Sequence, residues 1–554
     1  MAETGKPATL LDELFERYRA GQISRRELLR DAGIAAAMLA VAGRVAPGGV
    51  AAQDETPKPG GTFTYALDQT GDTLDPEVTT YAVTNKININ VFDPLVWQAP
   101  DLSFVPGLAE SWEVAPDGKA YTFHLRQDAK FHDGTPVNAE AVKFSWERIM
   151  NPETKSKTAI GQMGSFSQAV VVDEFTVRAE FADPNATFLD SVSQSYCSPI
   201  SPTAVQKFGA DFAHNLVGTG PYMLKEWVEN DHVTLVKNPD YNWAPSIFGH
   251  QGPGYLDEIV FKMIPDGATR TGTLQSGETD GVDSVAPKDV GVFKDDSDYQ
   301  VLNAAVPGIP NVLALNTEKA PTNELPVRQA LNFGIDKQTI ISSLFFDQYV
   351  PAYGPLNAAT LGFDESLKTL YPYDPEKAKS LLEEAGWTVG SDGIREKAGQ
   401  KLSVSYYTNT AQDLAAPLIQ AQWKDIGIDT QINSMDYNAL IPLVTKGEAN
   451  IGSIGWIQAD PDVVRYLLYS KNIDTGYGWT RFRRDELDGL IVAASGEVDI
   501  EKRKQLYAQI QQITMQNALI VPVYDLAAIY ALRSYVKNFR VDTRGWYPWL
   551  YDVW

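Results

Sequence analysis

The fold is decided by the stretch Leu108–Pro152, whose sequence is LAESWEVAPDGKAYTFHLRQDAKFHDGTPVNAEAVKFSWERIMNP. Within it, Tyr121–Leu125 alternates apolar and polar residues, a pattern that predicts a strand. Asp133-Gly134 is typical of a tight turn. Asn138–Met150 places apolar residues at helical spacing, and its first residue is suited to cap a helix. The stretch therefore predicts strands and a helix in succession.

The same alternation continues outward from this stretch. Val170–Phe181 predicts a hairpin that turns at Asp173-Glu174. Asp374–Trp387 predicts a helix with an aspartate cap, a proline at its first position and a glycine stop. Glu501–Ala518 predicts a long amphipathic helix. Strands dominate the earlier half, so we predict an α/β protein with a larger N-terminal lobe.

Length and charge limit the class of protein. The chain has 554 residues, which predicts two or three domains. Its formal net charge of −24 argues against nucleic acid or an anionic membrane as a partner. The single cysteine, Cys197, excludes an intrachain disulfide and is expected to be a small buried residue.

Residues 1–52 have the features of a cleavable export signal. Ser24–Arg30 contains the pair Arg25-Arg26 and resembles the twin-arginine export motif. The apolar run Ile34–Gly43 is far shorter than the roughly 20 residues that span a bilayer. Val50-Ala51-Ala52 predicts cleavage before Gln53. We expect an exported, extracytoplasmic protein without a lipoprotein cysteine.

Motifs of catalysis are missing from the sequence. The five histidines form no HExxH pattern, and neither a GxSxG elbow nor a P-loop occurs. His132 beside Asp133 is interpreted as a hydrogen-bonded turn histidine. Paired carboxylates of a glycoside hydrolase stay open, because 71 acidic residues offer many accidental pairs. We predict that the protein is not an enzyme and holds no cofactor.

Six segments, in order, resemble the bacterial extracellular solute-binding proteins of family 5, the peptide/nickel type, which serve ABC importers. The segments are Leu108–Pro152, Val217–Trp227, Lys237–Trp243, Leu274–Asp280, Val327–Lys337 and Tyr371–Trp387. The resemblance implies the two-lobed periplasmic-binding-protein (venus flytrap) fold, type II, with an extra subdomain inserted in lobe I. The chain would cross between lobes near Ala305–Pro310 and Pro522–Ala528.

The implied domain boundaries follow from those crossings. Lobe I would comprise residues 57–95, 215–305 and 525–554, the inserted subdomain residues 96–214, and lobe II residues 306–524, after the signal peptide at 1–52. Closure of the lobes would bury the ligand and strengthen its polar contacts.

The resemblance also implies a cleft motif in Gly455–Asp462, GWIQADPD. In peptide-binding members a Trp followed closely by an Asp lies at the cleft, and the Asp meets the peptide ammonium. The candidates here are Trp456 and Asp460, with three residues between them where two is usual, and Asp462 is the alternative register. The other interpretation is a strand end followed by a turn at Asp460-Pro461.

Three further aromatic residues are candidates for the cleft wall: Tyr81, Tyr353 and Trp479. Each could equally be ordinary packing.

The resulting hypothesis is a solute-binding protein that captures a peptide or similar small organic solute and delivers it to ABC permease subunits. We expect a monomer, exported by the twin-arginine machinery; a nickel site ranks below an organic ligand. The alternatives are a secreted hydrolase, a ligand sensor coupled to a membrane receptor, and a peptide-holding chaperone.

Overall fold

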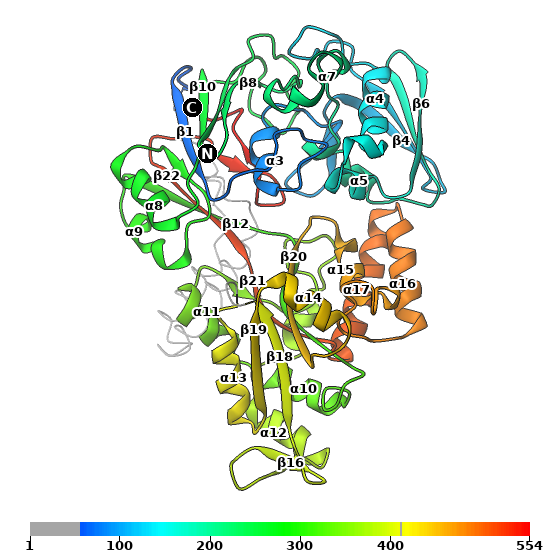
Figure 1. Ribbon diagram of the computed structural model, residues 1–554, viewed down its shortest axis with the longest axis vertical. Helices are drawn as coiled ribbons and strands as arrows, with labels where there is room; N and C mark the ends of the chain where they lie inside the picture. Colours follow the sequence, from blue (N-terminus) through cyan, green and yellow to red (C-terminus); the bar gives the residue numbers. More distant parts are fainter. Residues whose placement is uncertain (1–55, 410–412) are drawn as a thin grey trace, which may run out of the picture. The chain divides into compact units, whose positions relative to one another are not determined.

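The computed structural model describes residues 56–409 and 413–554 (Figure 1). Residues Lys58–Trp554 form one unit by their internal contacts. The predicted export signal, residues 1–52, lies outside the described residues. Two large mixed sheets organise the unit, and each becomes the centre of one lobe. We define lobe I as residues 58–305 and 527–554, and lobe II as residues 308–525.

The central sheet of lobe I has seven strands, in which β1 runs parallel to both of its neighbours, β10 and β11. Their order is β12 (Tyr299–Ala305), β22 (Ala527–Arg533), β11 (Gly281–Val282), β1 (Thr62–Leu67), β10 (Glu258–Met263), β9 (His232–Lys237) and β8 (Tyr222–Val228). Strand β22 comes from the far end of the chain, so the C-terminal segment completes lobe I.

A separate antiparallel sheet of lobe I carries the stretch that opened the sequence analysis. It consists of β4 (Ala109–Val114), β5 (Ala120–Leu125), β7 (Thr176–Phe181) and β6 (Phe166–Asp173). Helix α4 (Ala139–Met150) packs on it through Trp146, whose ring meets Phe188 edge to face at 5.6 Å. These aromatic contacts give the four-stranded sheet a core of its own.

The sheet of lobe II is covered on both faces. Its order is β14 (Val350–Pro351), β21 (Ile520–Asp525), β13 (Gly308–Leu315), β20 (Ile451–Ile457), β18 (Ser403–Asn409) and β19 (Asp429–Met435). Along β13, Leu313 and Leu315 enter one core while Val312 and Ala314 enter another. This alternation follows from the two-residue period of a strand, and it explains why residues 312–315 are all apolar.

Two groups of helices supply those cores. One face of the sheet packs with α10 (Leu325–Phe333), α11 (Lys337–Phe345), α12 (Pro375–Glu384) and α13 (Ala416–Asp425). The other packs with α14 (Tyr437–Thr445), α15 (Val464–Leu468), α16 (Asp485–Gly496) and α17 (Ile500–Gln516). Helices α15 to α17 lie beside the carboxyl end of β20, which positions the cleft described below.

Several local predictions are confirmed. Asn138 caps α4, its side chain accepting a hydrogen bond from the Ala141 backbone N–H at 3.0 Å. Asp374 caps α12 in the same way. Strands β6 and β7 form the predicted hairpin, with Asp173 opposite Thr176. Each signal acts over three or four residues, which is why the sequence was sufficient to find it.

Candidate ligand-binding cleft

A cavity of about 900 Å³ lies between side chains of the two lobes. From lobe II it is lined by the end of β20 and by residues near α15. From lobe I it is lined by helix α3 (Ala82–Asn88), by residues around α5 (Thr158–Met163) and by the C-terminal segment at Arg544. The Ala186 backbone N–H donates to the Ser495 carbonyl at 3.2 Å, so the lobes touch beside the cavity.

The lobe II wall is built on aromatic rings. Trp456, at the end of β20, stacks on Tyr466 of α15 with ring centroids 5.0 Å apart and an interplanar angle of 19°. Tyr477 meets the other side of this pair, edge to face with Trp456 at 5.1 Å. Tyr477 in turn contacts Trp479 at 5.5 Å. The four rings form a continuous series from the core of lobe II to the cavity; we call it the aromatic ladder.

Asp460 is engaged within lobe II. Arg503 of α17 donates to both of its carboxylate oxygens, at 2.7 and 2.8 Å, and both side chains are buried. Asp460 also accepts from the Asp462 backbone N–H at 2.8 Å and so caps the short helix η6 (Pro461–Val463). A bidentate arginine–carboxylate pair is a strong, geometrically specific contact. The carboxylate is thereby committed to holding α17 against the turn after β20.

Asp462 lines the cavity and is paired as well. Arg465 donates to it at 2.9 Å, and the Tyr507 hydroxyl donates to it at 3.0 Å. Burial raises the pKa of Asp462, and the neighbouring Arg465 opposes that rise. The two charged side chains that line the cavity from lobe II are therefore bonded to each other.

The lobe I wall centres on Arg544. Its guanidinium donates to Asp190 at 2.6 Å and to Asp542 at 3.0 Å, so one cation serves two buried carboxylates. Asp190 lines the cavity, and Gln194 donates to its second oxygen at 3.2 Å. Burial raises the pKa of Asp190, while Arg544 lowers it. This polar cluster faces the aromatic ladder across the cavity.

The structure distributes the site residues predicted from sequence over several places. Trp456 and Asp462 line the cavity, whereas Asp460 lies behind them. Tyr81 is 46% exposed and precedes Ala82, which lines the cavity. Trp479 is 1% exposed and belongs to the lobe II core, where its indole N–H donates to Thr445.

Tyr353 lies away from the cavity. It packs against the same core as Trp479, and the Lys337 ammonium lies 5.4 Å from its ring centroid. Residues that the sequence analysis did not single out take its place at the wall: Tyr196, Tyr466, Arg544, Trp546 and Tyr547. Only Tyr466 had a usable signal, its position within two turns of the cleft motif; the others come from distant segments.

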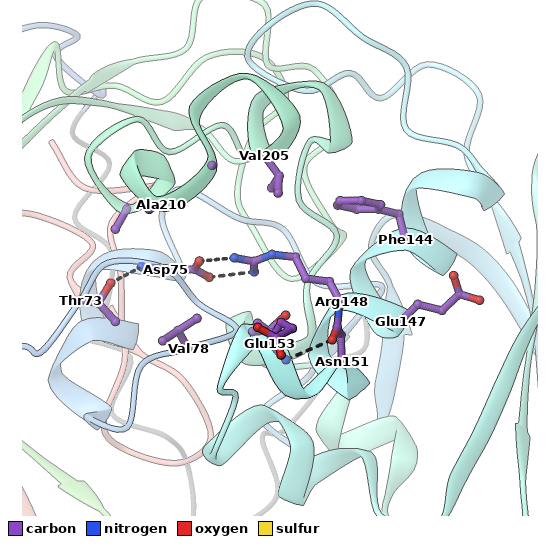
Figure 2. Close-up of a pocket in the computed structure, with 13 residues that line it drawn as sticks. Thr73, Asp75, Val78, Phe144, Glu147, Arg148, Asn151, Glu153, Val205 and Ala210 are labelled. Atoms are coloured by element: carbon purple, nitrogen blue, oxygen red, sulfur yellow. Dashed lines mark hydrogen bonds and ion pairs between the residues drawn. The ribbon is translucent and has the colours of Figure 1, made fainter.

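A second cavity, of about 700 Å³, lies within lobe I (Figure 2). Arg148 of α4 crosses it, donating to Asp75 at 2.6 Å and to the buried Glu77 at 2.6 Å. Figure 2 shows the guanidinium and the Asp75 carboxylate face to face. Arg148 pairs with both carboxylates at its centre, and the cavity takes no side chain from lobe II.

Metal sites and membrane-spanning helices would be visible within residues 56–409 and 413–554. Within these ranges, side chains of His, Cys, Asp and Glu form no cluster able to hold a metal ion. No helix in the same ranges combines the length and apolar character needed to cross a bilayer. His132 is the predicted turn histidine: its ring accepts from the Gly218 backbone N–H at 3.3 Å and bonds the Gly220 carbonyl at 3.0 Å.

Two sheet-centred lobes joined by two crossings, with a cavity between them, define a two-lobed α/β binding protein. The sequence profile described as bacterial extracellular solute-binding proteins, family 5 Middle, matches residues 103–476. The chain belongs to this family of extracellular solute-binding proteins.

Named relatives agree with that assignment. The chain is 32% identical to "Heme-binding protein A" of Haemophilus influenzae over 80% of this chain and 82% of the relative. It is 28% identical to the "Dipeptide-binding protein" of Escherichia coli K12, over 87% and 93%. Among solved structures, the ABC transporter-associated periplasmic binding protein DppA from Helicobacter pylori, in complex with the peptide STSA, matches with a TM-score of 0.67 and 25% identity, covering 89% of this chain and 99% of that one.

Proposed function

We propose that the protein captures a peptide or similar small organic solute in the cavity between its lobes and delivers it to the permease subunits of an ABC importer. The observation that carries the proposal is the cavity itself, about 900 Å³ in volume and lined by both lobes. Pockets for small organic ligands commonly have about 300–1,000 Å³. A ligand that touches both lobes stabilises their closed arrangement, and a closed arrangement is what a permease can distinguish.

The relatives support an organic ligand. The names of two relatives specify heme and a dipeptide, and the solved structure is a complex with the peptide STSA. We assign Trp456 and Asp462 to direct contact with the ligand and Tyr81 to the rim of the cavity. Asp460 and Trp479 act as positioning residues, because they hold the turn after β20 and the aromatic ladder. Tyr353 supports the lobe II core.

Export precedes this function. We propose that residues 1–52 direct the chain to the twin-arginine machinery and are cleaved before Gln53. The mature protein then acts outside the inner membrane as a monomer and without chemical turnover. Replacing Arg25 and Arg26 together by lysine should abolish export in pulse-chase fractionation. Processing that continues unchanged in the double variant would exclude the twin-arginine route.

Native mass spectrometry of the gently purified mature protein tests the binding function. We expect an additional mass that disappears when the same sample is denatured, and its fragments identify the ligand. The variant Asp462→Asn keeps the shape of a cavity-lining side chain and should alter the retained amount. A bare protein mass, followed by a solute panel that produces no thermal shift, would contradict the proposed function.

A further inference from the structure

The cavity surface of lobe II consists of rings. Tyr466 is 41% exposed although one part of it stacks on Trp456, so a substantial area of the ring remains uncovered. Ile457, beside Trp456, also lines the cavity and is 42% exposed. Large apolar side chains exposed at a concave surface are typical of a binding site rather than of packing.

The aromatic ladder fixes these rings in place. Trp479 is buried, its indole N–H is bonded to Thr445, and it supports Tyr477, which supports Trp456. Tyr466 is therefore the outer ring of a series anchored in the core. A ring held in this way loses little conformational entropy when it binds a ligand.

Charge is already neutralised along this wall. Asp460 is bonded at both oxygens by Arg503, and Asp462 is bonded by Arg465 and Tyr507. A ligand ammonium would have to compete with these partners for the same carboxylate oxygens. An uncharged flat group faces no such competition, because stacking on an aromatic surface leaves both ion pairs in place.

We propose that the lobe II wall recognises a flat aromatic group of the ligand by stacking on Tyr466 and Trp456, and that neither Asp460 nor Asp462 provides the principal contact by binding a ligand ammonium. The inference rests on the proposed function, because it names the chemistry of the same cavity. The flat group could belong to an aromatic side chain of a short peptide or to a free planar molecule. These sources share one chemistry and are separated by the probes below.

Isothermal titration calorimetry on the mature protein, after removal of retained ligand by unfolding and refolding, tests the proposal. The probes are the dipeptides Ala-Trp and Ala-Ala, haem, and methylammonium, whose N–H groups can donate to a carboxylate. We expect Ala-Trp or haem to bind at least tenfold more tightly than Ala-Ala. Tyr466→Ala should weaken the affinity for that ring-bearing probe by roughly tenfold. Tyr466→Phe should leave the affinity within about twofold of wild type, since the ring is retained.

The matched control is Tyr373→Ala, which removes a tyrosine of lobe II that is 52% exposed and does not line the cavity, and it should leave affinity unchanged. The proposal is overturned if neither Ala-Trp nor haem binds more tightly than Ala-Ala, if methylammonium is the preferred probe, or if Asp462→Asn weakens the binding of both dipeptides more than tenfold. Each of these results leaves the proposed function standing. Failure of the wild-type protein to bind any probe or to retain any solute would remove both.

Discussion

In the lobe II wall of the cleft, each aspartate pairs with its own arginine, whereas in the lobe I wall one arginine pairs with two aspartates. In lobe II the pairs are Arg503 with Asp460 and Arg465 with Asp462. In lobe I, Arg544 alone serves Asp190 and Asp542. Each of these aspartates of lobe II thus has an arginine of its own, whereas Asp190 and Asp542 share one. Because burial penalises an unpaired charge, the two walls should respond differently when an arginine is removed.

The pairing of these charges also bears on what each wall contributes to ligand binding. Because Asp460 and Asp462 are both paired with arginines, the contribution of the lobe II wall to binding comes from the aromatic ladder. In lobe I, burial raises the pKa of Asp190 even though Arg544 lowers it, so Asp190 shares its cation with Asp542 in a buried setting. A flat apolar part of a ligand is therefore better accommodated by lobe II, and a polar part by the charged and amide side chains of lobe I.

The largest effect is expected from Arg544→Met, which leaves two carboxylates buried without their cation. Removing one partner of a buried pair costs about 3–5 kcal/mol, and two stranded partners place this variant near the upper value. The measurement is urea unfolding at pH 7.5. At pH 5 the loss relative to wild type should be smaller, since the raised pKa of Asp190 lets it take up a proton.

Adding Asp190→Asn to Arg544→Met provides the check on that explanation. The second change removes a stranded charge and should restore part of the stability. A double variant no more stable than Arg544→Met would mean that the arginine acts through packing instead of charge.

Arg503→Met should have the next largest effect, about 3 kcal/mol, because it strands one buried carboxylate instead of two. Asp460 keeps its backbone hydrogen bond in η6, which limits the loss. Urea unfolding measures it, and Arg483→Met is the control: Arg483 is 55% exposed and pairs with Glu318 at the surface, so its loss should cost under about 0.5 kcal/mol. Equal losses in the two variants would contradict the assignment of a buried, energetically important pair.

A smaller difference between the lobes is expected in how much stability each loses at low pH. All five histidines lie in lobe I by sequence position, and burial lowers the pKa of His132 to about 4. In the unfolded chain the His132 imidazole binds a proton near pH 6.5, whereas in the folded protein it does so only near pH 4. The free energy of unfolding therefore falls as the pH decreases from about 6.5 to about 4. From pH 7.5 to 5 the loss due to His132 should be about 2 kcal/mol.

The variant His132→Gln should remove that pH-dependent part whatever its effect on stability at pH 7.5. His232→Gln is the control, since hydrogen bonding to Asp231 raises the pKa of His232 and its contribution has the opposite sign. If His132→Gln loses as much stability as wild type between pH 7.5 and 5, the buried histidine is not the acid-sensitive group.

The sequence predicted the features whose causes are local. The two-lobed α/β fold followed from six family-like segments, and the caps at Asn138 and Asp374 followed from spacing alone. The partners of charged side chains did not follow, because Asp460 and Arg503 lie 43 residues apart and Arg544 and Asp190 lie 354 apart. Nothing in a single sequence shows which of 47 basic residues reaches a given carboxylate.

The assignment of Asp460 illustrates the limit. A Trp followed by an Asp resembles the cleft motif equally well whether the carboxylate faces a ligand or an internal arginine. Burial and the position of α17 decide between them, and both depend on tertiary packing. Trp479 is a similar case: its sequence context gave no sign that it supports the cleft from the core through Tyr477.

The smallest effect is expected from Arg465→Met, and it isolates position as the cause of the differences above. Arg465 and Asp462 form the same kind of pair as Arg503 and Asp460, and the two aspartates are only two residues apart, but Arg465 and Asp462 are both partly exposed at the cavity. Water can solvate the stranded Asp462, so the loss in urea unfolding should stay below about 1 kcal/mol. A loss comparable to that of Arg503→Met would mean that the cavity is as dry as the core. In that case the lobe II wall would not be a solvent-accessible surface to which a ligand can bind.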